Sequence, residues 1–228
     1  MPTKLSVIVP VYNEVDTLRT IVEHVREVPV EKEVLIVDDG STDGTRGVLK
    51  SFEGQPGIRV ILHDRNHGKG RAIRTGIASA VGDAIIIQDA DLEYDPMDYL
   101  PLLAAMEKTG ANVVYGSRFL GKKLVTSPWH RAVNWFLTVV TNVLYGSRLT
   151  DMETCYKLFR ADTLRALPPC SDGFEIEVEL SARTLLNNER IVEVPVSYKG
   201  RSYHEGKKIG WKDGVKALLL LVRSRFIV

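Results

Sequence analysis

The sequence predicts an α/β fold with a central, largely parallel mixed sheet. Two patterns in residues 1–118 predict it: short apolar runs rich in β-branched residues alternate with helical segments, and acidic residues follow several of the runs. Strands that alternate with helices are typical of α/β sandwiches with a parallel sheet. Ligands of such sheets bind beyond the carboxyl ends of the strands, so we expect the functional site where the acids lie.

Five strands are expected in the first part of the chain, over residues 5–11, 33–39, 58–63, 83–89 and 111–118. Asp16 is the candidate N-cap of the first helix, because apolar residues at helical spacing follow it, namely Leu18, Ile21, Val22 and Val25. A glycine loop and a helix rich in small residues occupy residues 67–82. Asp95 and Pro96 begin a further helix, since proline is favoured in a first turn.

The last third of the chain has a looser pattern. Helices are expected over residues 127–146, 174–186 and 211–228, and strands over 155–160 and 189–198. The first of these helices is unusually apolar and aromatic, and the last is apolar in its middle and basic at its end. No linker or internal repeat is visible, so residues 1–228 are expected to form one compact domain.

Composition excludes several classes of protein. The chain has 228 residues and a formal net charge of +1, whereas general nucleic-acid binders are strongly basic. Residues 199–228 are nevertheless basic, which suggests an anionic partner there. Two cysteines do not make a disulfide framework, and no apolar run reaches the roughly 18–20 residues of a spanning helix. We expect a cytoplasmic protein without a secretory signal, at most attached to a membrane surface.

The stretch AIIIQDADLEYDP, residues 84–96, carries the chemistry. In a strand, residues i and i+2 face the same way, so Asp89 and Asp91 would aim two carboxylates at one point. Like charges that close repel unless a cation lies between them. Mg²⁺ and Mn²⁺ prefer oxygen ligands, and Mg²⁺ fills its remaining positions with water and phosphates. The pair therefore predicts a metal-bound phosphate ester, and an exposed turn is the alternative.

The usual phosphate-binding loops are absent from the sequence. Neither GxGxxG nor GxxxxGK[ST] occurs, so a metal and side chains must hold the phosphates. Cationic candidates surround the glycine loop NHGKG: His67, Lys69, Arg71 and Arg74.

Four blocks in order carry a family resemblance: VPVYNE (9–14), VDDGSTDGT (37–45), NHGKGRAIRTG (66–76) and QDADLEYDP (88–96). Together they resemble an inverting family 2 glycosyltransferase with the GT-A fold. The resemblance continues through YGSRF (115–119), DMETCYKLFR (151–160) and GRSYHEGKKIGWKDG (200–214), and it covers nearly the whole chain. These later blocks are similar to dolichyl-phosphate mannosyltransferases and bacterial polyprenyl-phosphate glycosyltransferases.

The resemblance implies roles for particular residues. A nucleotide-sugar site is implied for Pro10, Tyr12, Glu14, Asp39, Lys69, Ala90, Arg201, Lys207 and Lys208, with the last three on a mobile loop. The metal site is implied for Asp89, Asp91 and Glu93, of which Asp91 is also catalytic, and several relatives have Gln in place of Glu93. Arg118 and Arg131 resemble the catalytic pair that grips the acceptor's phosphate. Asp151 and Thr154 are expected near the acceptor, in a block that departs from the family at Cys155, Tyr156 and Lys157.

The expected reaction is a transfer of hexose, with Mg²⁺ or Mn²⁺, from GDP-mannose or UDP-glucose to a polyprenyl phosphate such as dolichyl or undecaprenyl phosphate. The acceptor's phosphate is already anionic, so no general base is nominated. Residues 1–118 would bind the nucleotide sugar, and residues 119–228 would face the acceptor and the membrane. Segments 127–146 and 211–228 would then lie in the interface at the cytoplasmic face of the membrane, or else be ordinary core helices.

Three alternatives stay open. The acceptor is a soluble sugar or a polysaccharide in the first, and the protein binds nucleotide sugars without catalysis in the second. A sugar-phosphate nucleotidyltransferase is the third, although its glycine-rich N-terminal loop is missing.

Overall fold

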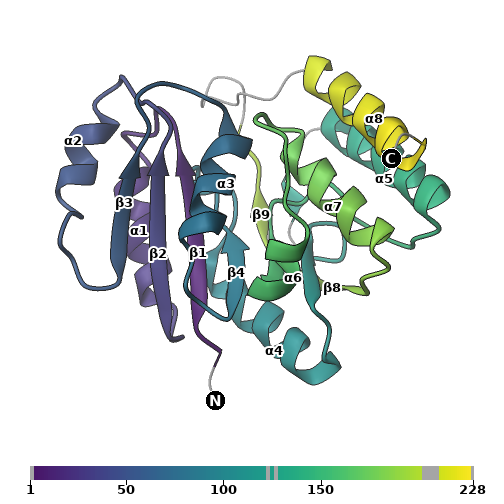
Figure 1. Cartoon of the computed structure of the whole chain (residues 1–228), viewed down its shortest axis with the longest axis horizontal. Coiled ribbons are helices and arrows are strands. Elements are labelled where there is room, and N and C mark those ends of the chain that lie inside the picture. The colour runs from purple at the N-terminus through teal and green to yellow at the C-terminus, as the bar shows by residue number, and fades with distance from the viewer. Residues whose placement is uncertain (1–2, 122–123, 126–127, 202–210, 227–228) are drawn as a thin grey trace.

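The computed structural model describes residues 3–121, 124–125, 128–201 and 211–226 (Figure 1). Its main feature is a seven-stranded sheet in the order β3-β2-β1-β4-β7-β5-β8. The strands are β1 (Leu5–Val11), β2 (Lys32–Asp38), β3 (Ile58–Leu62), β4 (Ala84–Ile87), β5 (Val113–Ser117), β7 (Lys157–Arg160) and β8 (Ile191–Pro195). Only β7 runs antiparallel to its neighbours β4 and β5 among these described strands. The expected α/β fold with a mixed, mostly parallel sheet is confirmed.

The sheet is built by both parts of the chain. Strand β7 lies between β4 and β5, with Ile86 and Val114 both opposite Leu158. Strand β8 extends the sheet beyond β5, with Val114 opposite Val192. The first 118 residues therefore do not complete the sheet by themselves.

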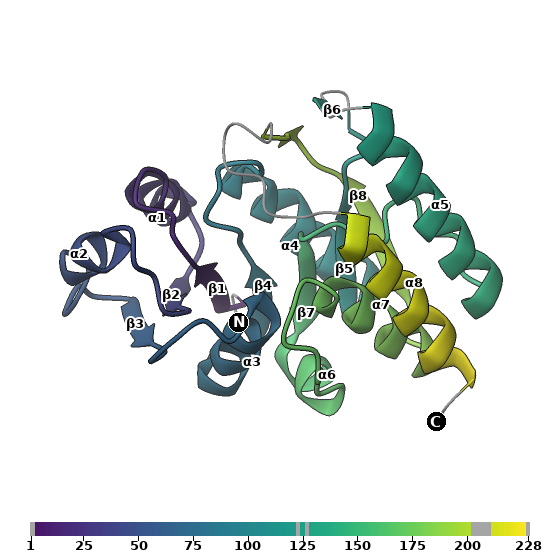
Figure 2. The ribbon, with the colours of Figure 1, turned by 90° about the horizontal axis from the view of Figure 1, so that it is seen from above.

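Alternation along the strands creates two apolar layers. Val7 and Val9 face one cluster, and Ile8 between them faces the other, as the two-residue period of a strand requires. Helices α1 (Leu18–Glu27) and α4 (Tyr99–Thr109) cover the first face, and α3 (Lys69–Ser79), α6 (Ala161–Ala166) and α7 (Ile176–Leu186) cover the second. Figure 2 shows these two helical layers from above.

The ends of two helices test the predicted caps. Helix α1 begins at Leu18, and the backbone N–H groups of Thr17 and Leu18 both donate to the carbonyl oxygen of Glu14. The prediction of Asp16 as N-cap is therefore wrong, because the first turn already closes on Glu14. Asp95 is confirmed as a cap: its side chain accepts from Met97 N at 2.9 Å at the start of a 3₁₀ turn, η1 (Pro96–Asp98), that leads into α4.

Four short elements in the described part of the chain were not predicted. Helices of less than two turns and strands of two residues are too short to show a hydrophobic period in the sequence. The four elements are α2 (Thr45–Lys50), α6, β6 (Leu124–Val125) and β9 (Tyr198–Lys199).

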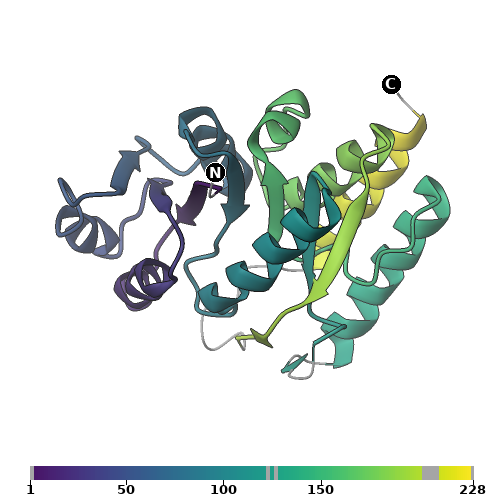
Figure 3. The ribbon, with the colours of Figure 1, turned by 90° about the horizontal axis from the view of Figure 1, so that it is seen from below.

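Two long helices, α5 (Pro128–Tyr145) and α8 (Trp211–Phe226), pack against each other and against α7. The Tyr145 hydroxyl donates to the Leu221 carbonyl oxygen at 2.8 Å across this contact. The pair lies at the end of the molecule away from β3 (Figure 3). Large apolar side chains on both helices face outward, including Trp129, Trp135, Leu219 and Phe226. Within the described ranges, no helix combines the length and the apolar character that crossing a membrane demands.

Candidate active site

A cavity of about 830 Å³ lies beyond the carboxyl ends of β1, β2, β4 and β5. Most of the predicted site residues that the structure describes line it: Pro10, Tyr12, Glu14, Asp39, Lys69, Asp89, Ala90, Asp91, Glu93, Arg118, Arg131 and Arg201. The cationic candidates His67, Arg71 and Arg74 do not line it. Lys207 and Lys208 lie outside the described residues. The cavity continues between α5, α7 and α8, where its walls become apolar with Phe136, Leu137, Val215 and Leu218.

Asp89 and Asp91 reach the cavity by a different route from the one predicted. Strand β4 ends at Ile87, so both aspartates lie in the turn that follows it and not in the strand. Leu92 has a positive φ of 62°, which turns the chain sharply after Asp91. The strand period is therefore the wrong reason for their shared side, although both carboxylates line the same cavity.

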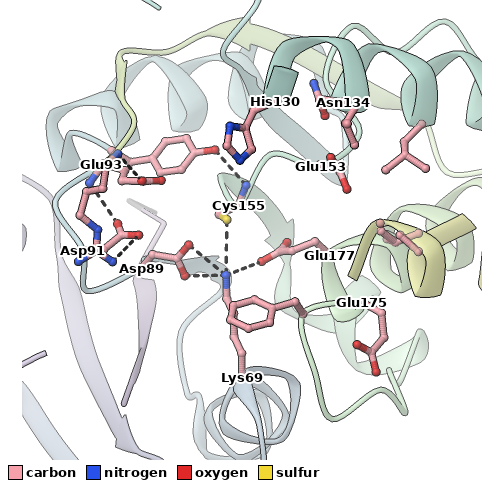
Figure 4. A pocket seen from close by; sticks show the side chains of 18 of the residues that line it. Lys69, Asp89, Asp91, Glu93, His130, Asn134, Glu153, Cys155, Glu175 and Glu177 are labelled. Carbon is pink, nitrogen blue, oxygen red and sulfur yellow. Dashed lines mark hydrogen bonds and ion pairs between the residues drawn. The ribbon is translucent and has the colours of Figure 1, made fainter. Parts of the chain in front are cut away.

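Lys69 is the central cation of the site (Figure 4). Its Nζ lies 2.7 Å from Asp89 Oδ1, 3.2 Å from Glu177 Oε1 and 3.5 Å from Cys155 Sγ. Burial alone would lower the pKa of Lys69, but the carboxylates of Asp89 and Glu177 outweigh burial and raise that pKa well above its usual value. Lys69 is therefore a permanent cation next to Asp89.

Two glycines let the loop before Lys69 approach the segment at residues 171–173. Gly68 has a φ of +102°, which favours glycine, and a Cβ there would lie 2.2 Å from the Asp172 carbonyl oxygen. A Cβ on Gly70 would lie 2.3 Å from the Ser171 carbonyl oxygen. The NHGKG loop is thus a close backbone contact that positions Lys69.

Asp91 carries the most perturbed carboxyl group of the cavity. Burial raises the pKa of Asp91 to about 7, and the nearby charges of Asp89 and Glu93 add to the effect. Arg201 opposes it, with Nη2 at 3.3 Å from Asp91 Oδ2. The same guanidinium contacts Glu14 at 3.1 and 3.2 Å. Arg201 therefore connects the loop after β1, which holds Glu14, to the turn after β4, which holds Asp91.

Glu93 is occupied by hydrogen bonds. Its carboxylate accepts from the Tyr198 hydroxyl at 2.5 Å and from Arg201 N at 2.6 Å, which fastens the segment after β8 across the cavity. No group of three or more His, Cys, Asp or Glu side chains in the described ranges is placed to hold a metal. The three-carboxylate site of Asp89, Asp91 and Glu93 therefore stays a prediction.

A smaller donor set still fits a divalent cation. Mg²⁺ commonly takes one or two protein carboxylates and completes its coordination with substrate phosphates and water. Asp89 and Asp91 line one cavity, and the raised pKa of Asp91, caused first by burial, reflects negative charge that a cation would relieve. These two carboxylates are the fitting donors, and Glu93 is committed elsewhere.

Asp39 is 2% exposed and organises the loop before α3. Its carboxylate contacts His63 Nδ1 at 2.7 Å and accepts from the backbone N–H groups of His67 and Gly68. His63 Nε2 lies 3.0 Å from Thr75 Oγ1, so the imidazole is held on both sides. Asp39 therefore connects the end of β2 to the glycine loop.

Arg118 and Arg131 differ in their surroundings. Arg118 pairs with the fully buried Asp151 and lies 5.1 Å from the centre of the Tyr198 ring. Arg131 is exposed on α5 and has no ion pair with a described residue. Thr154 is buried and donates to the Gly116 carbonyl oxygen, so Asp151 and Thr154 support the cavity wall without lining it.

Several cavity residues were not assigned by the sequence: Asn134, Glu153, Phe174 and Glu177. Glu177 belongs to FEIEVEL, whose alternation resembles a strand although α7 is a helix. An acid on the apolar face of that helix was the available signal. This signal identifies a site residue only in the folded structure, where Lys69 and Lys157 each contact the Glu177 carboxylate at 3.2 Å.

Comparisons with known proteins agree with this geometry. The Glycosyl transferase family 2 model matches residues 6–167. An undecaprenyl-phosphate mannosyltransferase of Micrococcus luteus is 31% identical over 215 residues, which are 91% of this chain and 88% of that protein. An undecaprenyl-phosphate 4-deoxy-4-formamido-L-arabinose transferase of Edwardsiella ictaluri is 27% identical over 209 residues, which are 89% of this chain and 62% of that protein.

A solved structure shares the fold. Glucosyl-3-phosphoglycerate synthase of Mycobacterium tuberculosis, in complex with uridine diphosphate, superposes with a TM-score of 0.76 at 19% identity. The superposition covers 99% of this chain and 81% of that chain. The predicted GT-A fold is confirmed by this match.

Proposed function

Because the chain belongs to glycosyl transferase family 2 and is a glycosyltransferase, we propose that it transfers a hexose from a nucleotide sugar to a polyprenyl phosphate at a membrane surface. One observation carries the proposal: a single cavity joins the charged residues at the sheet's edge to apolar walls on α5 and α8. The charged end suits the diphosphate of a nucleotide sugar, and the apolar walls suit the hydrocarbon chain of a lipid phosphate. The names of the relatives from Micrococcus luteus and Edwardsiella ictaluri, both undecaprenyl-phosphate transferases, support the same acceptor class.

The donor would occupy the end formed by residues 1–118. Tyr12 and Asp39 would border the nucleoside, and the half-buried cations Lys69 and Arg201 would face the pyrophosphate. GDP-mannose and UDP-glucose are the proposed donors. Residues 119–228 would face the acceptor, with Arg131 on its phosphate and the α5–α8 groove on its first isoprene units.

A divalent cation, Mg²⁺ or Mn²⁺, would be held by Asp89 and Asp91. When bound it would neutralise charge that develops on the departing nucleoside diphosphate. Lys69, at 2.7 Å from Asp89, would add a fixed positive charge on the same side of the phosphates.

The proposed reaction is an inverting displacement. An oxygen of the acceptor's phosphate forms a bond to the anomeric carbon while the bond from that carbon to the nucleotide's terminal phosphate oxygen breaks. Both partners are anions, so the residues must bring them together; Arg131 on one side and Lys69 with Arg201 on the other supply the compensating charge. No proton has to leave the attacking oxygen, and no general base is assigned.

The outward apolar faces of α5 and α8 are proposed to rest on the membrane. Trp129 and Trp135 are 68% and 66% exposed, and Arg223 and Arg225 flank the apolar part of α8. Amphipathic helices of this kind lie in the interface, with cations on anionic lipid. We propose peripheral attachment to the cytoplasmic face.

The deciding experiment supplies purified protein with Mn²⁺ and a panel of GDP- and UDP-sugars, first with a short polyprenyl phosphate and then with soluble sugars and polysaccharides. We expect one sugar to move to the polyprenyl phosphate only. Transfer to a soluble acceptor alone would replace the acceptor class, and nucleotide-sugar binding without any transfer would indicate a non-catalytic protein.

A further inference from the structure

Asn134, which lines the cavity, carries a buried hydrogen-bond acceptor without a partner among the described residues. Asn134 of α5 is 5% exposed, and its Nδ2 donates to Asp151 Oδ1 at 3.1 Å. Among the described residues nothing donates to its Oδ1. Asp151 fixes the orientation of this amide, because the flipped side chain would set two acceptor oxygens against each other. Buried polar atoms are normally satisfied, so an unsatisfied one on a residue that lines a cavity indicates a ligand.

Glu153 adds a second acceptor on the same wall. It follows Asp151 by two residues, lines the cavity, and forms no hydrogen bond or ion pair with a described residue. Figure 4 shows His130 and Asn134 reaching down from α5 toward the side of the cavity where Glu153 lies. Helix α5 and the loop before β7 thus each contribute a residue with an unsatisfied acceptor to the lining of the same cavity.

The acids Asp151 and Glu177 around Glu153 disfavour a phosphate as the ligand of this wall. Asp151 is compensated by Arg118, and Glu153 has the acid Glu177 as well as the cation Lys157 in its surroundings. Burial raises the pKa of Glu153, and Arg118 and Lys157 only partly oppose it. An anion would meet acceptor oxygens here. A group that donates hydrogen bonds and carries no negative charge suits them, and hydroxyl groups have this chemistry.

We propose that Asn134 and Glu153 form a subsite that accepts hydrogen bonds from hydroxyl groups of a sugar. The inference rests on the proposed function and adds to it a place where sugar hydroxyls are read. Phe174 and Val178, which line the cavity nearby, supply the apolar wall that the carbon face of a sugar ring requires. The hydroxyls belong either to the transferred hexose or to a hydroxylated acceptor.

The test measures discrimination between hydroxylated and deoxygenated ligands. Wild type, Glu153→Gln and Asn134→Leu are compared with nucleotide sugars that lack one ring hydroxyl at a time, and separately with acceptors with and without hydroxyl groups. Wild type should prefer the complete ligand by about tenfold in kcat/KM at one hydroxyl, and the variants should reduce this preference to less than about twofold. The arm in which the preference changes identifies the source of the hydroxyl.

Asn142 provides the matched control on α5. Its Oδ1 accepts from Ser147 Oγ and Leu149 N, so it is satisfied inside the protein. Asn142→Leu should lower stability and leave the hydroxyl preference unchanged. If Asn134→Leu fails to fold, Glu153→Gln carries the test, because it keeps the size of the side chain and changes only its charge and hydrogen-bonding pattern.

Binding of methyl glycosides, followed by ligand-observed NMR, separates this inference from the proposed function. Binding that weakens in Glu153→Gln without any nucleotide-sugar turnover would keep the subsite and remove the proposed function. Turnover in which wild type and variants show equal hydroxyl preferences would keep the function and overturn the subsite, leaving Asn134 with an ordered water only. Absence of both glycoside binding and hydroxyl preference in wild type would likewise overturn it.

Discussion

Arg118 and Asp151 form a bidentate ion pair, with Nε to Oδ2 and Nη2 to Oδ1 distances of 2.7 Å each. The backbone N–H of Arg118 donates to the same carboxylate at 2.9 Å. Asp151 is fully buried, so the guanidinium charge is compensated inside the protein. The pair joins the end of β5 to the loop before β7 and makes Arg118 a structural residue before it is a phosphate ligand.

Arg118→Ala should destabilise the protein strongly. The substitution leaves a buried carboxylate without its cation, which typically costs about 3–5 kcal/mol. Arg118→Lys should recover only part of this, since an ammonium cannot form the paired contacts of a guanidinium. Urea denaturation gives the free energy of unfolding. A change of less than about 1 kcal/mol for the alanine variant would contradict the structural role, given the usual effect of surface substitutions.

Arg131→Ala is the control for this prediction. Arg131 is exposed, so its loss should change the unfolding free energy by no more than about 0.5 kcal/mol. Its effect should appear instead as a KM for polyprenyl phosphate raised about tenfold or more, because a charge-assisted contact to the phosphate is lost. Equal losses of nucleotide affinity in both variants would oppose the acceptor role that the sequence suggests for the pair.

Lys69→Met should abolish most of the transfer activity. The change removes the cation between Asp89 and Glu177, and Glu177 then keeps only its 3.2 Å contact with Lys157. We expect kcat to fall by about a hundredfold or more, as when a preorganised charge at a reacting centre is lost. Arg71→Met, on the exposed side of the same helix, should keep its activity. Equal kcat values for the two variants would show that Lys69 has no part in catalysis.

The sequence predicted most of the fold because its strands are short apolar runs and its longer helices are periodic. Asp39 and Asp89 were predicted at the site because each follows an apolar run, whereas Pro10 was assigned only through the resemblance of VPVYNE to the family. The sequence could not predict that Glu93 would bind Tyr198 and the backbone of Arg201, because these contacts join segments more than one hundred residues apart. The sequence also could not predict the orientation of the Asn134 amide, because Asp151 fixes it through a contact that exists only in the folded protein.

Gly70→Ala should destabilise the protein by about 1–3 kcal/mol. The added methyl group would lie 2.3 Å from the Ser171 carbonyl oxygen, and backbone on both sides leaves no flexible atom to move away. Gly47→Ala in α2 is the matched variant, with nothing within 4 Å of the new atom. It should stabilise the helix by about 0.5–1 kcal/mol, because alanine is the better helix former. Similar melting temperatures for both variants would mean that the loop contact is loose.

Glu33 should make stability depend on acid pH. Burial would raise the pKa of Glu33, but hydrogen bonds from Ser6 and Val81 N and the charge of Arg59 outweigh it, so the net pKa is lowered. A lowered folded pKa means that the stabilisation is present above the unfolded value of about 4.3 and disappears as the pH falls through the folded value. Glu33→Gln should therefore be less stable than wild type at pH 7 by about 1–3 kcal/mol, and the difference should shrink as the pH falls below about 4.3.

Urea midpoints between pH 7 and pH 3 measure this convergence. Glu23→Gln, on the exposed face of α1, should run parallel to wild type throughout. A constant gap between wild type and Glu33→Gln at every pH would assign the effect to packing instead of charge.

Attachment to lipid should depend on α5. Trp129 and Trp135 are exposed on this helix next to the cavity, and transfer of each large apolar side chain into the interface contributes about 1.5–3 kcal/mol. The double variant Trp129→Ser, Trp135→Ser should bind anionic vesicles at least about tenfold more weakly than wild type. Leu62→Ser, Val81→Ser removes two exposed apolar residues elsewhere and should bind like wild type.

Salt separates the two contributions to that binding. Arg223 and Arg225 would act on anionic headgroups, and screening shortens their reach to about 3 Å at 1 M salt. Wild type should therefore leave anionic vesicles at high salt in co-sedimentation. The tryptophan variant should also show a raised KM for polyprenyl phosphate in vesicles and an unchanged KM for the nucleotide sugar, because only the lipid substrate is reached through this face. Binding that ignores salt, lipid charge and both tryptophans would leave α5 and α8 as ordinary covering helices.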